Sequence, residues 1–237
     1  MIDHGVDLES AQQYAGLAVA GVESDLANLT IDKISPRDLA RVASLATYLD
    51  TLGWACFQRG ELKRAAKLVD AAWRLSLRGQ AGDRLGQIYE KEGRTQEAAR
   101  MYALAASAAH SPAETRARLE KLVGGTKQAD DLIVHVREDP SLFGEHSLPR
   151  LLPAGASGSA EFLVLLGTEA SPVAVKFLRG DSSLRAAADK IRELALGPAV
   201  PDESPAKVPR LGRLACAAQG QACTFSFFPA DQVRAAD

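Results

Sequence analysis

Cysteine, histidine and aromatic residues are scarce in this chain. It has 3 cysteines and 4 histidines in 237 residues, and phenylalanine, tryptophan and tyrosine together make up 5%. Three cysteines are too few for the disulfide framework of a small secreted domain, and four dispersed histidines leave little material for a metal site. With so few aromatic rings, we do not expect a surface that stacks nucleobases.

The chain also lacks an excess of charge of one sign, since 28 Lys and Arg face 30 Asp and Glu. Nucleic acids and anionic membranes attract proteins with a clear basic excess, so we expect neither as a partner. No apolar run approaches the length of a transmembrane helix, and the first residues carry no signal-peptide pattern. We therefore expect a cytoplasmic protein by default, or a cell-envelope or periplasmic one if the chain is a fragment of a longer protein.

What the chain does have is a division into two parts of different composition. Nine of the 11 prolines follow residue 125, whereas residues 1–125 are rich in Ala, Leu, Glu and Arg, which favours helix. Beyond Gly124-Gly125 the chain has short β-rich runs separated by proline. The sequence predicts an α+β fold, with a helical domain over 1–125, a linker and docking segment over 126–159, and a small α+β domain over 160–237.

Charge is uneven inside the helical part. Residues 1–50 carry three basic and eight acidic side chains, and residues 51–125 carry thirteen and eight. A solvated surface accounts for most asymmetry of this kind, but it also biases the choice of partner.

The helical part contains a repeat with a period of 33 residues. The recurring pairs are Leu52-Gly53 with Leu85-Gly86, Gly60 with Gly93, Ala65 with Ala98, Val69 with Tyr102, and Ala72 with Ala105. The small residues let two paired helices approach closely, and Gly60 and Gly93 end the first helix of each pair, where a positive φ is cheap for glycine. Because each pair leaves one face uncovered, neighbouring pairs must stack.

This pattern resembles the tetratricopeptide repeat (TPR), an array of helical hairpins with a period of about 34 residues. The clearest copies span 46–78 and 79–112, and a capping helix follows over 113–123. Upstream, Ala11, Ala15 and Ala18 match the second helix of a further copy, and Ser35 is the expected N-cap of a long helix that runs to about Phe57. The resemblance implies a non-enzymatic scaffold or adaptor that binds a peptide or partner protein in a groove lined by the first helices.

Five residues on the first helices are the candidate partner contacts: Asp50, Trp54, Asp83, Gln87 and Glu90. The carboxylate clamp of some TPR proteins needs Lys and Asn at the first four of these positions, so binding of a chaperone tail is disfavoured. The repeated Asp-x-Leu-Gly instead predicts either a carboxylate ladder facing a basic or hydroxyl-bearing partner, or a structural role such as a helix cap at Asp83. Trp54 is either a packing residue or a ligand anchor.

Residues 160–237 show four β-rich runs and one helix. The runs cover 160–166, 173–178, 210–217 and 222–228, and the helix follows Asp181 or Ser182 and stops at Gly197-Pro198. This β-β-α-β-β order predicts a small antiparallel sheet with one helix packed on it.

The order and length of these elements loosely resemble the C-terminal domain of TonB-type proteins. Together with the stretches 48–54, 85–91 and 210–216, the chain resembles the end of bacterial multidomain proteins that join a transglutaminase-like domain, TPRs and such a tail. That resemblance implies the alternative function of a regulatory or positioning segment whose catalytic part is absent.

Cys216 and Cys223 lie opposite each other if Gln219-Gly220 forms a two-residue turn. In that register they form a hydrogen-bonded pair with Cα atoms about 5.5 Å apart. A disulfide is then possible, as are two reduced cysteines, and an oxidised pair would indicate the cell envelope. Cys56 falls at a packing position and is expected in the core.

The sequence contains no recognisable catalytic constellation. The histidines (His4, His110, His135 and His146) share no ligand spacing with Cys, Asp or Glu. Glu90, Glu92 and Glu97 stand beside Lys91 and Arg94 at helical spacing, which is typical of a solvated face. We therefore expect no enzymatic activity, no metal and no cofactor, and the sequence does not indicate an oligomeric state.

Overall fold

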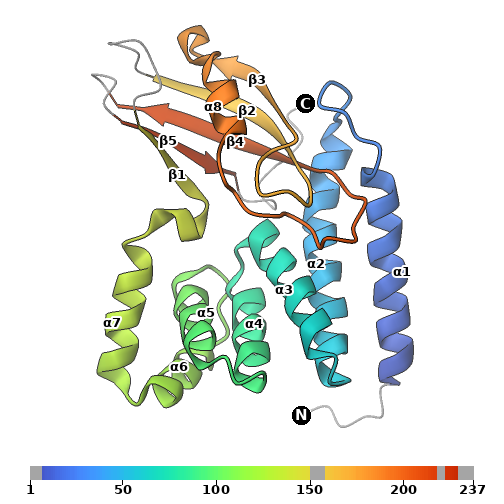
Figure 1. The fold of residues 1–237 in the computed structure, drawn as a ribbon, viewed down its shortest axis with the longest axis vertical. Helices are drawn as coiled ribbons and strands as arrows, with labels where there is room; N and C mark the ends of the chain where they lie inside the picture. Colours follow the sequence, from blue (N-terminus) through green and yellow to red (C-terminus); the bar gives the residue numbers. More distant parts are fainter. Residues whose placement is uncertain (1–6, 150–157, 218–221, 229–237) are drawn as a thin grey trace. The chain divides into compact units, whose positions relative to one another are not determined.

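A computed structural model describes residues 7–149, 158–217 and 222–228 (Figure 1). The chain divides into two compact units: unit 1 comprises Met1–Val22 and Ser44–Asp139, and unit 2 comprises Glu23–Ala43 and Pro140–Asp237. Helices come first along the chain and strands follow, which confirms the α+β class.

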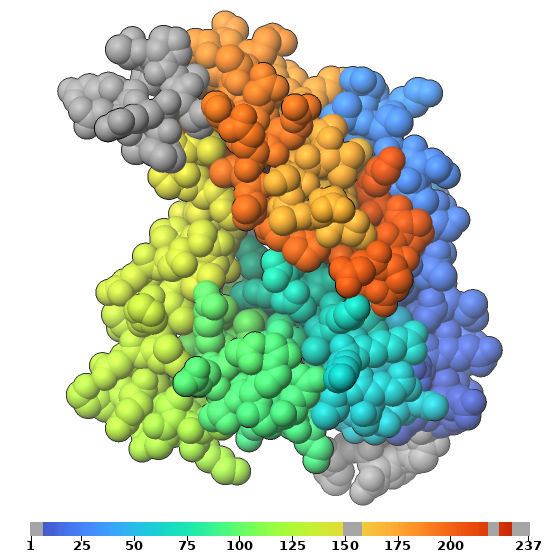
Figure 2. Space-filling view, in the orientation of Figure 1, coloured from blue at the N-terminus to red at the C-terminus, as the bar shows by residue number. Residues whose placement is uncertain are grey.

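Seven α-helices precede the first strand in the described part of the chain. They are α1 (Leu8–Leu26), α2 (Pro36–Gln58), α3 (Leu62–Ser76), α4 (Gly79–Lys91), α5 (Thr95–Ser107), α6 (Thr115–Val123) and α7 (Thr126–Arg137). Within unit 1, α3 packs on α4, α4 on α5, and α7 on both α5 and α6. Figure 2 shows the surfaces of α5 to α7, green to yellow-green, in continuous contact.

Glycine sets the turns and the close approaches of this helical array, as the repeat predicts. Gly60 and Gly93 follow the first helices with φ of 81° and 77°. A Cβ on Gly53 would lie 2.5 Å from Val69 Cγ2, and one on Gly86 would lie 2.6 Å from the Tyr102 ring. Only glycine therefore allows these helix pairs to pack at the observed distance.

The long helix α2 begins with a reciprocal cap. Ser35 Oγ accepts a hydrogen bond from the Asp38 backbone N–H at 3.3 Å, and the Ser35 backbone N–H donates to Asp38 Oδ2 at 2.9 Å. Pro36 occupies the first helical position, where its missing N–H costs nothing. The predicted N-cap and the predicted extent of this helix are both confirmed.

The helix predicted to end the array does not end it. Residues 126–149, which we expected to be linker, contain α7, the short 3₁₀ helix η1 (Pro140–Phe143) and a strand. In α7, Ala129, Ile133 and Val136 are buried, and this helix packs on α5 and α6, so the array continues beyond α6. The prediction missed it because a polar start, Thr-Lys-Gln after two glycines, resembles a break in the helical pattern.

Unit 2 is built on a five-stranded antiparallel sheet with the order β1-β5-β4-β2-β3. The strands are β1 (Glu145–Pro149), β2 (Gly158–Leu166), β3 (Ala174–Gly180), β4 (Val208–Cys216) and β5 (Ala222–Phe227). The predicted hairpin of β2 and β3 pairs Val164 with Val175. Phe162, Val164, Leu214 and Phe225 are fully buried and form the centre of this core.

Two features of unit 2 differ from the prediction. Strand β1 adds a fifth strand along β5, and its short polar sequence gave no β signal. The helix is shorter, consisting of the 3₁₀ turn η2 (Ser182–Leu184) and α8 (Ala187–Arg192). It cannot reach Gly197, because the backbone N–H groups of Leu196 and Gly197 donate to Ala170 O at 2.8 and 3.0 Å.

The segment 23–43, from the end of α1 to the start of α2, belongs to unit 2. Lys207 N donates to Leu26 O at 3.2 Å, Ser204 Oγ donates to Glu23 Oε1 at 2.5 Å, and Lys176 forms an ion pair with Asp32 at 2.6 Å. The second unit therefore includes helical residues from the N-terminal half of the sequence.

Candidate functional site

Two ion pairs join the first helices of successive pairs in unit 1. Arg84 on α4 donates to Asp50 Oδ2 on α2 at 2.6 Å. Arg118 Nη1 on α6 donates to both carboxylate oxygens of Asp83 on α4, each at 2.8 Å. The side chains of Asp50 and Asp83 are only 16% and 4% exposed, so each acid faces an arginine of the next first helix rather than solvent.

These contacts change the interpretation of the repeated aspartates. Their charges are neutralised within the chain, so they do not present a ladder of free carboxylates to a partner. Asp83 is also not a helix cap, because α4 begins four residues earlier, at Gly79. Gln87 Nε2 donates to Asp83 Oδ2 at 2.8 Å, which places this predicted contact residue against the same carboxylate.

Asp50 differs from Asp83 in how well its carboxylate is satisfied. Its Oδ1 is buried and has no hydrogen-bond partner among the described residues. Burial raises the pKa of Asp50, and the nearby Arg84 only partly offsets this effect. The Asp50 carboxylate therefore has one oxygen without a hydrogen bond, whereas both oxygens of Asp83 accept hydrogen bonds.

Trp54 belongs to the same arrangement as Asp50. The Arg84 guanidinium lies 5.0 Å from the centre of the Trp54 ring, and Phe57 stacks on that ring at 4.8 Å between centroids. Trp54 is half-buried, and its ring contacts both Arg84 and Phe57.

An open cavity of about 400 Å³ lies next to these ion pairs. Its lining residues come from α2, α4, α5 and α6: Phe57, Gln87, Glu90, Lys91, Tyr102, Arg118 and Lys121. Tyr102 is fully buried and its hydroxyl donates to Glu90 Oε2 at 2.8 Å, so this tyrosine fixes the carboxylate of Glu90. Burial and this hydrogen bond both raise the pKa of Tyr102, which keeps the hydroxyl protonated as a donor.

The cavity brings together Gln87 and Glu90 of the predicted contacts and adds residues that the sequence analysis missed. Phe57 could have been predicted from the sequence, because it lies 33 residues before Glu90, at the equivalent position of the repeat. The arginines had a signal too: Arg84 and Arg118 follow Asp50 and Asp83 by 34 and 35 residues. Lys121 had no such signal, because α6 departs from the repeat pattern.

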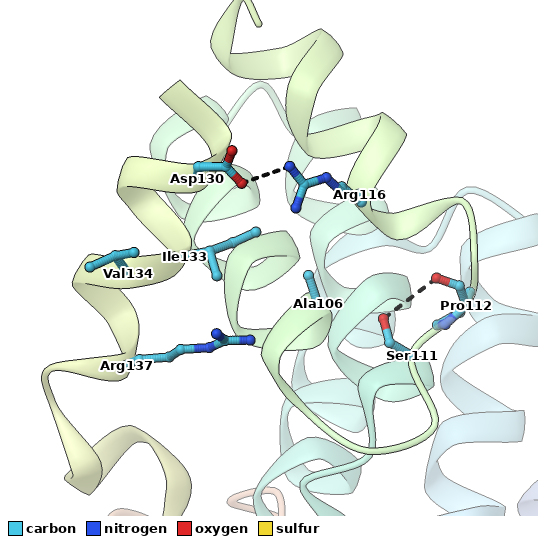
Figure 3. A pocket seen from close by; sticks show the side chains of 8 residues that line it. All are labelled: Ala106, Ser111, Pro112, Arg116, Asp130, Ile133, Val134 and Arg137. Atoms are coloured by element: carbon cyan, nitrogen blue, oxygen red, sulfur yellow. Dashed lines mark hydrogen bonds and ion pairs between the residues drawn. The ribbon is translucent and has the colours of Figure 1, made fainter. Parts of the chain in front are cut away.

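A second cavity, of about 420 Å³, lies between α5, α6 and α7 (Figure 3). Arg116 and Asp130 face each other across it with an ion pair of 2.6 Å, and Arg116 also binds Glu120 at 3.0 Å. Ala106, Ile133 and the 56% exposed Val134 supply apolar surface. Arg116 is thus already paired with two carboxylates, and none of the predicted contact residues lines this second cavity.

Cys216 and Cys223 form a disulfide that links β4 and β5. They lie directly opposite each other, as expected, and both are buried. Their Cα atoms are 4.1 Å apart, which matches a non-hydrogen-bonded pair (about 4.5 Å) and not the hydrogen-bonded pair that we predicted. The predicted turn at Gln219-Gly220 lies outside the described residues. Cys56 is a free, buried cysteine, as expected.

The described residues contain no group of three or more His, Cys, Asp or Glu side chains placed to hold a metal ion. Among the same residues, no helix combines the length and the apolar character needed to cross a membrane.

Comparison of the chain with known proteins gives no relative. No protein-family model, no curated protein and no solved structure matches it.

Proposed function

We propose that unit 1 is a non-enzymatic protein-interaction module, with a TPR-like helical array that holds a peptide segment of a partner protein in the cavity beside α2, α4 and α6. The observation that carries this proposal is that two predicted contact residues, Gln87 and Glu90, line one open cavity together with the half-buried aromatic ring of Phe57. Aromatic side chains beside polar groups are the usual anchors of protein interfaces.

The surroundings of the cavity favour a preformed site. The Asp83–Arg118 pair and the Tyr102–Glu90 hydrogen bond hold polar side chains from three helices in fixed positions. A site that is ordered before binding loses less conformational entropy when the partner docks. The cavity is also open to solvent, which suits a side chain projecting from an extended peptide better than an enclosed small molecule.

The test is a peptide-display selection against the purified full chain, followed by binding measurements with the selected peptides. Phe57→Ala removes the half-buried aromatic ring that lines the cavity, and Tyr14→Ala removes an exposed ring (71% exposed) on α1, far from it in sequence. We expect the selected peptides to bind Phe57→Ala on the order of tenfold more weakly, as for a contact worth about 1.4 kcal/mol, and Tyr14→Ala unchanged. Peptides that bind both variants equally well would place the interaction elsewhere and refute the proposal.

A second candidate function is a regulatory or positioning segment of a larger cell-envelope protein. The observation that favours it is the Cys216–Cys223 disulfide, because such bonds persist in oxidising compartments. Thiol labelling of the protein in intact cells of its source tests it. Two protected cysteines that become reactive only after reduction support this candidate, and three freely reactive cysteines in the denatured protein contradict it.

A further inference from the structure

Two lysines from different helices line the same cavity without a partner in the described part of the chain. Lys91 ends α4 and Lys121 lies in the last turn of α6, and both side chains are exposed. They are lining residues of the cavity, and no described hydrogen bond or ion pair engages either of them. Two ammonium groups are thus available to a bound ligand.

The acidic groups near these lysines are committed to other contacts. Asp83 lies almost completely buried beneath Arg118, which takes both of its oxygens. Glu90 is oriented by the Tyr102 hydroxyl. Because Asp83 neutralises Arg118, the cavity lining has two unpaired cations, Lys91 and Lys121, beside the single carboxylate of Glu90. All the lining residues lie in the stretch 51–125, whose net charge is +5.

The cavity wall is not purely ionic. The half-buried ring of Phe57 supplies aromatic surface to the lining. Arg118 is held in place by its contact with Asp83, while its Nη2 and Nε stay free of described partners. A ligand that fits both properties has an apolar or aromatic side chain flanked by carboxylates. Each carboxylate gains a charge-assisted hydrogen bond, and the apolar group is removed from water.

We infer that the partner segment is an acidic peptide, in which an aromatic or aliphatic residue enters the cavity and neighbouring Asp or Glu side chains bind Lys91 and Lys121. This inference rests on the proposed function and specifies the chemistry of its partner. A basic peptide would meet repulsion at Lys91 and Lys121. A nucleic acid would need an extended basic track, and the chain as a whole has a net charge of −2.

The test uses fluorescence anisotropy with three labelled peptides that share one central Phe. In the first it is flanked by Asp and Glu, in the second by Ser, and in the third by Lys. The variant is Lys91→Glu/Lys121→Glu in the full chain. The control, Lys33→Glu/Lys63→Glu, makes the same change in net charge at two exposed lysines that do not line the cavity.

We expect the acidic peptide to bind the unaltered protein best and to lose affinity on the order of tenfold in the cavity variant, because two partly exposed ion pairs are replaced by repulsion. The control should change affinity by less than about twofold. The cavity variant should bind the Lys-flanked peptide better than the unaltered protein does. Raising the salt concentration should reduce the preference for the acidic peptide.

Three outcomes overturn the inference. They are equal binding of the acidic and Ser-flanked peptides, equal losses in the cavity and control variants, and stronger competition by an oligothymidine than by the unlabelled acidic peptide. If Phe57→Ala abolishes binding while the lysine variant does not weaken it, the proposed function stands and the acidic specificity fails. If Phe57→Ala has no effect on any peptide, the proposed function itself fails.

Discussion

The Asp83–Arg118 ion pair should contribute measurably to the stability of unit 1, and Asp83→Asn tests this directly. The substitution keeps the shape of the side chain but removes its charge. It also places an NH₂ group where a carboxylate oxygen accepts from Arg118 or Gln87. Because the Asp83 side chain is 4% exposed, water cannot easily replace the lost acceptor.

The expected magnitude lies between two limits. Breaking a fully buried ion pair costs about 3–5 kcal/mol, and an exposed pair contributes about 0.2–1 kcal/mol. Here the carboxylate is buried but the Arg118 side chain is 35% exposed, so water stabilises the arginine that is left behind. We expect a loss of about 1.5–3 kcal/mol in the free energy of unfolding, the range for hydrogen bonds to charged groups.

The assay is urea denaturation followed by far-ultraviolet circular dichroism, whose signal comes mainly from the helices. The control is Asp131→Asn, which removes the Lys127–Asp131 pair, where the side chains are 82% and 65% exposed. Its effect should stay below about 0.5 kcal/mol. Arg118→Gln alone and combined with Asp83→Asn completes a double-mutant cycle with a coupling energy of at least about 1 kcal/mol. A loss for Asp83→Asn no larger than that of the control, or strictly additive effects, refutes the reasoning.

Three further predictions follow from the same structure. Gly86→Ala should destabilise the protein by about 1–3 kcal/mol, because the new Cβ would lie 2.6 Å from the Tyr102 ring. Gly21→Ala on α1, where nothing lies within 4 Å of the new Cβ, should instead stabilise the protein by up to about 1 kcal/mol. Urea denaturation measures both changes, and equal effects would contradict the packing argument. Cys216→Ser/Cys223→Ser should cost about 2 kcal/mol for this short loop, and a reducing agent should lower the melting temperature of the unaltered protein but not of the variant. Asp50 has a raised pKa in the folded state, so its contribution to stability is greatest below the unfolded value of about 3.9 and declines as the pH rises through the folded value. Asp50→Asn should therefore gain stability relative to the unaltered protein as the pH rises from about 4 through the folded pKa of Asp50. A stability difference that does not change with pH would show that the charge is not the cause.

Local and periodic signals were sufficient to predict much of the fold. The 33-residue offset correctly placed Gly60 and Gly93 at turns and Gly53 and Gly86 at close contacts, because each position depends on one short-range requirement. Ser35 as N-cap is equally local. The failures concern elements without such a signal: β1 is a strand only because it pairs with β5, about 80 residues later in the chain.

The candidate site was only partly predictable for the same reason. The repeat singled out Asp50 and Asp83, but their role depends on arginines one repeat later, and the offset of 34 or 35 residues differs from the period of 33. Tyr102 was identified only as the repeat counterpart of Val69, and its hydroxyl proves to fix Glu90. Sequence patterns identified helix faces, whereas the sharing of one cavity by α2, α4, α5 and α6 became visible only in three dimensions.

The spacing of the two ion pairs has a consequence for how such an array can change in length. Each aspartate forms its ion pair with an arginine of the following helical pair, so both junctions are held by the same kind of interaction. Removal of one 33-residue copy would bring Asp50 and Arg118 to a separation of 35 residues, the spacing of the present Asp83–Arg118 pair. Gene duplication or deletion in units of one copy can therefore lengthen or shorten the array while each remaining junction keeps a matching acid and base.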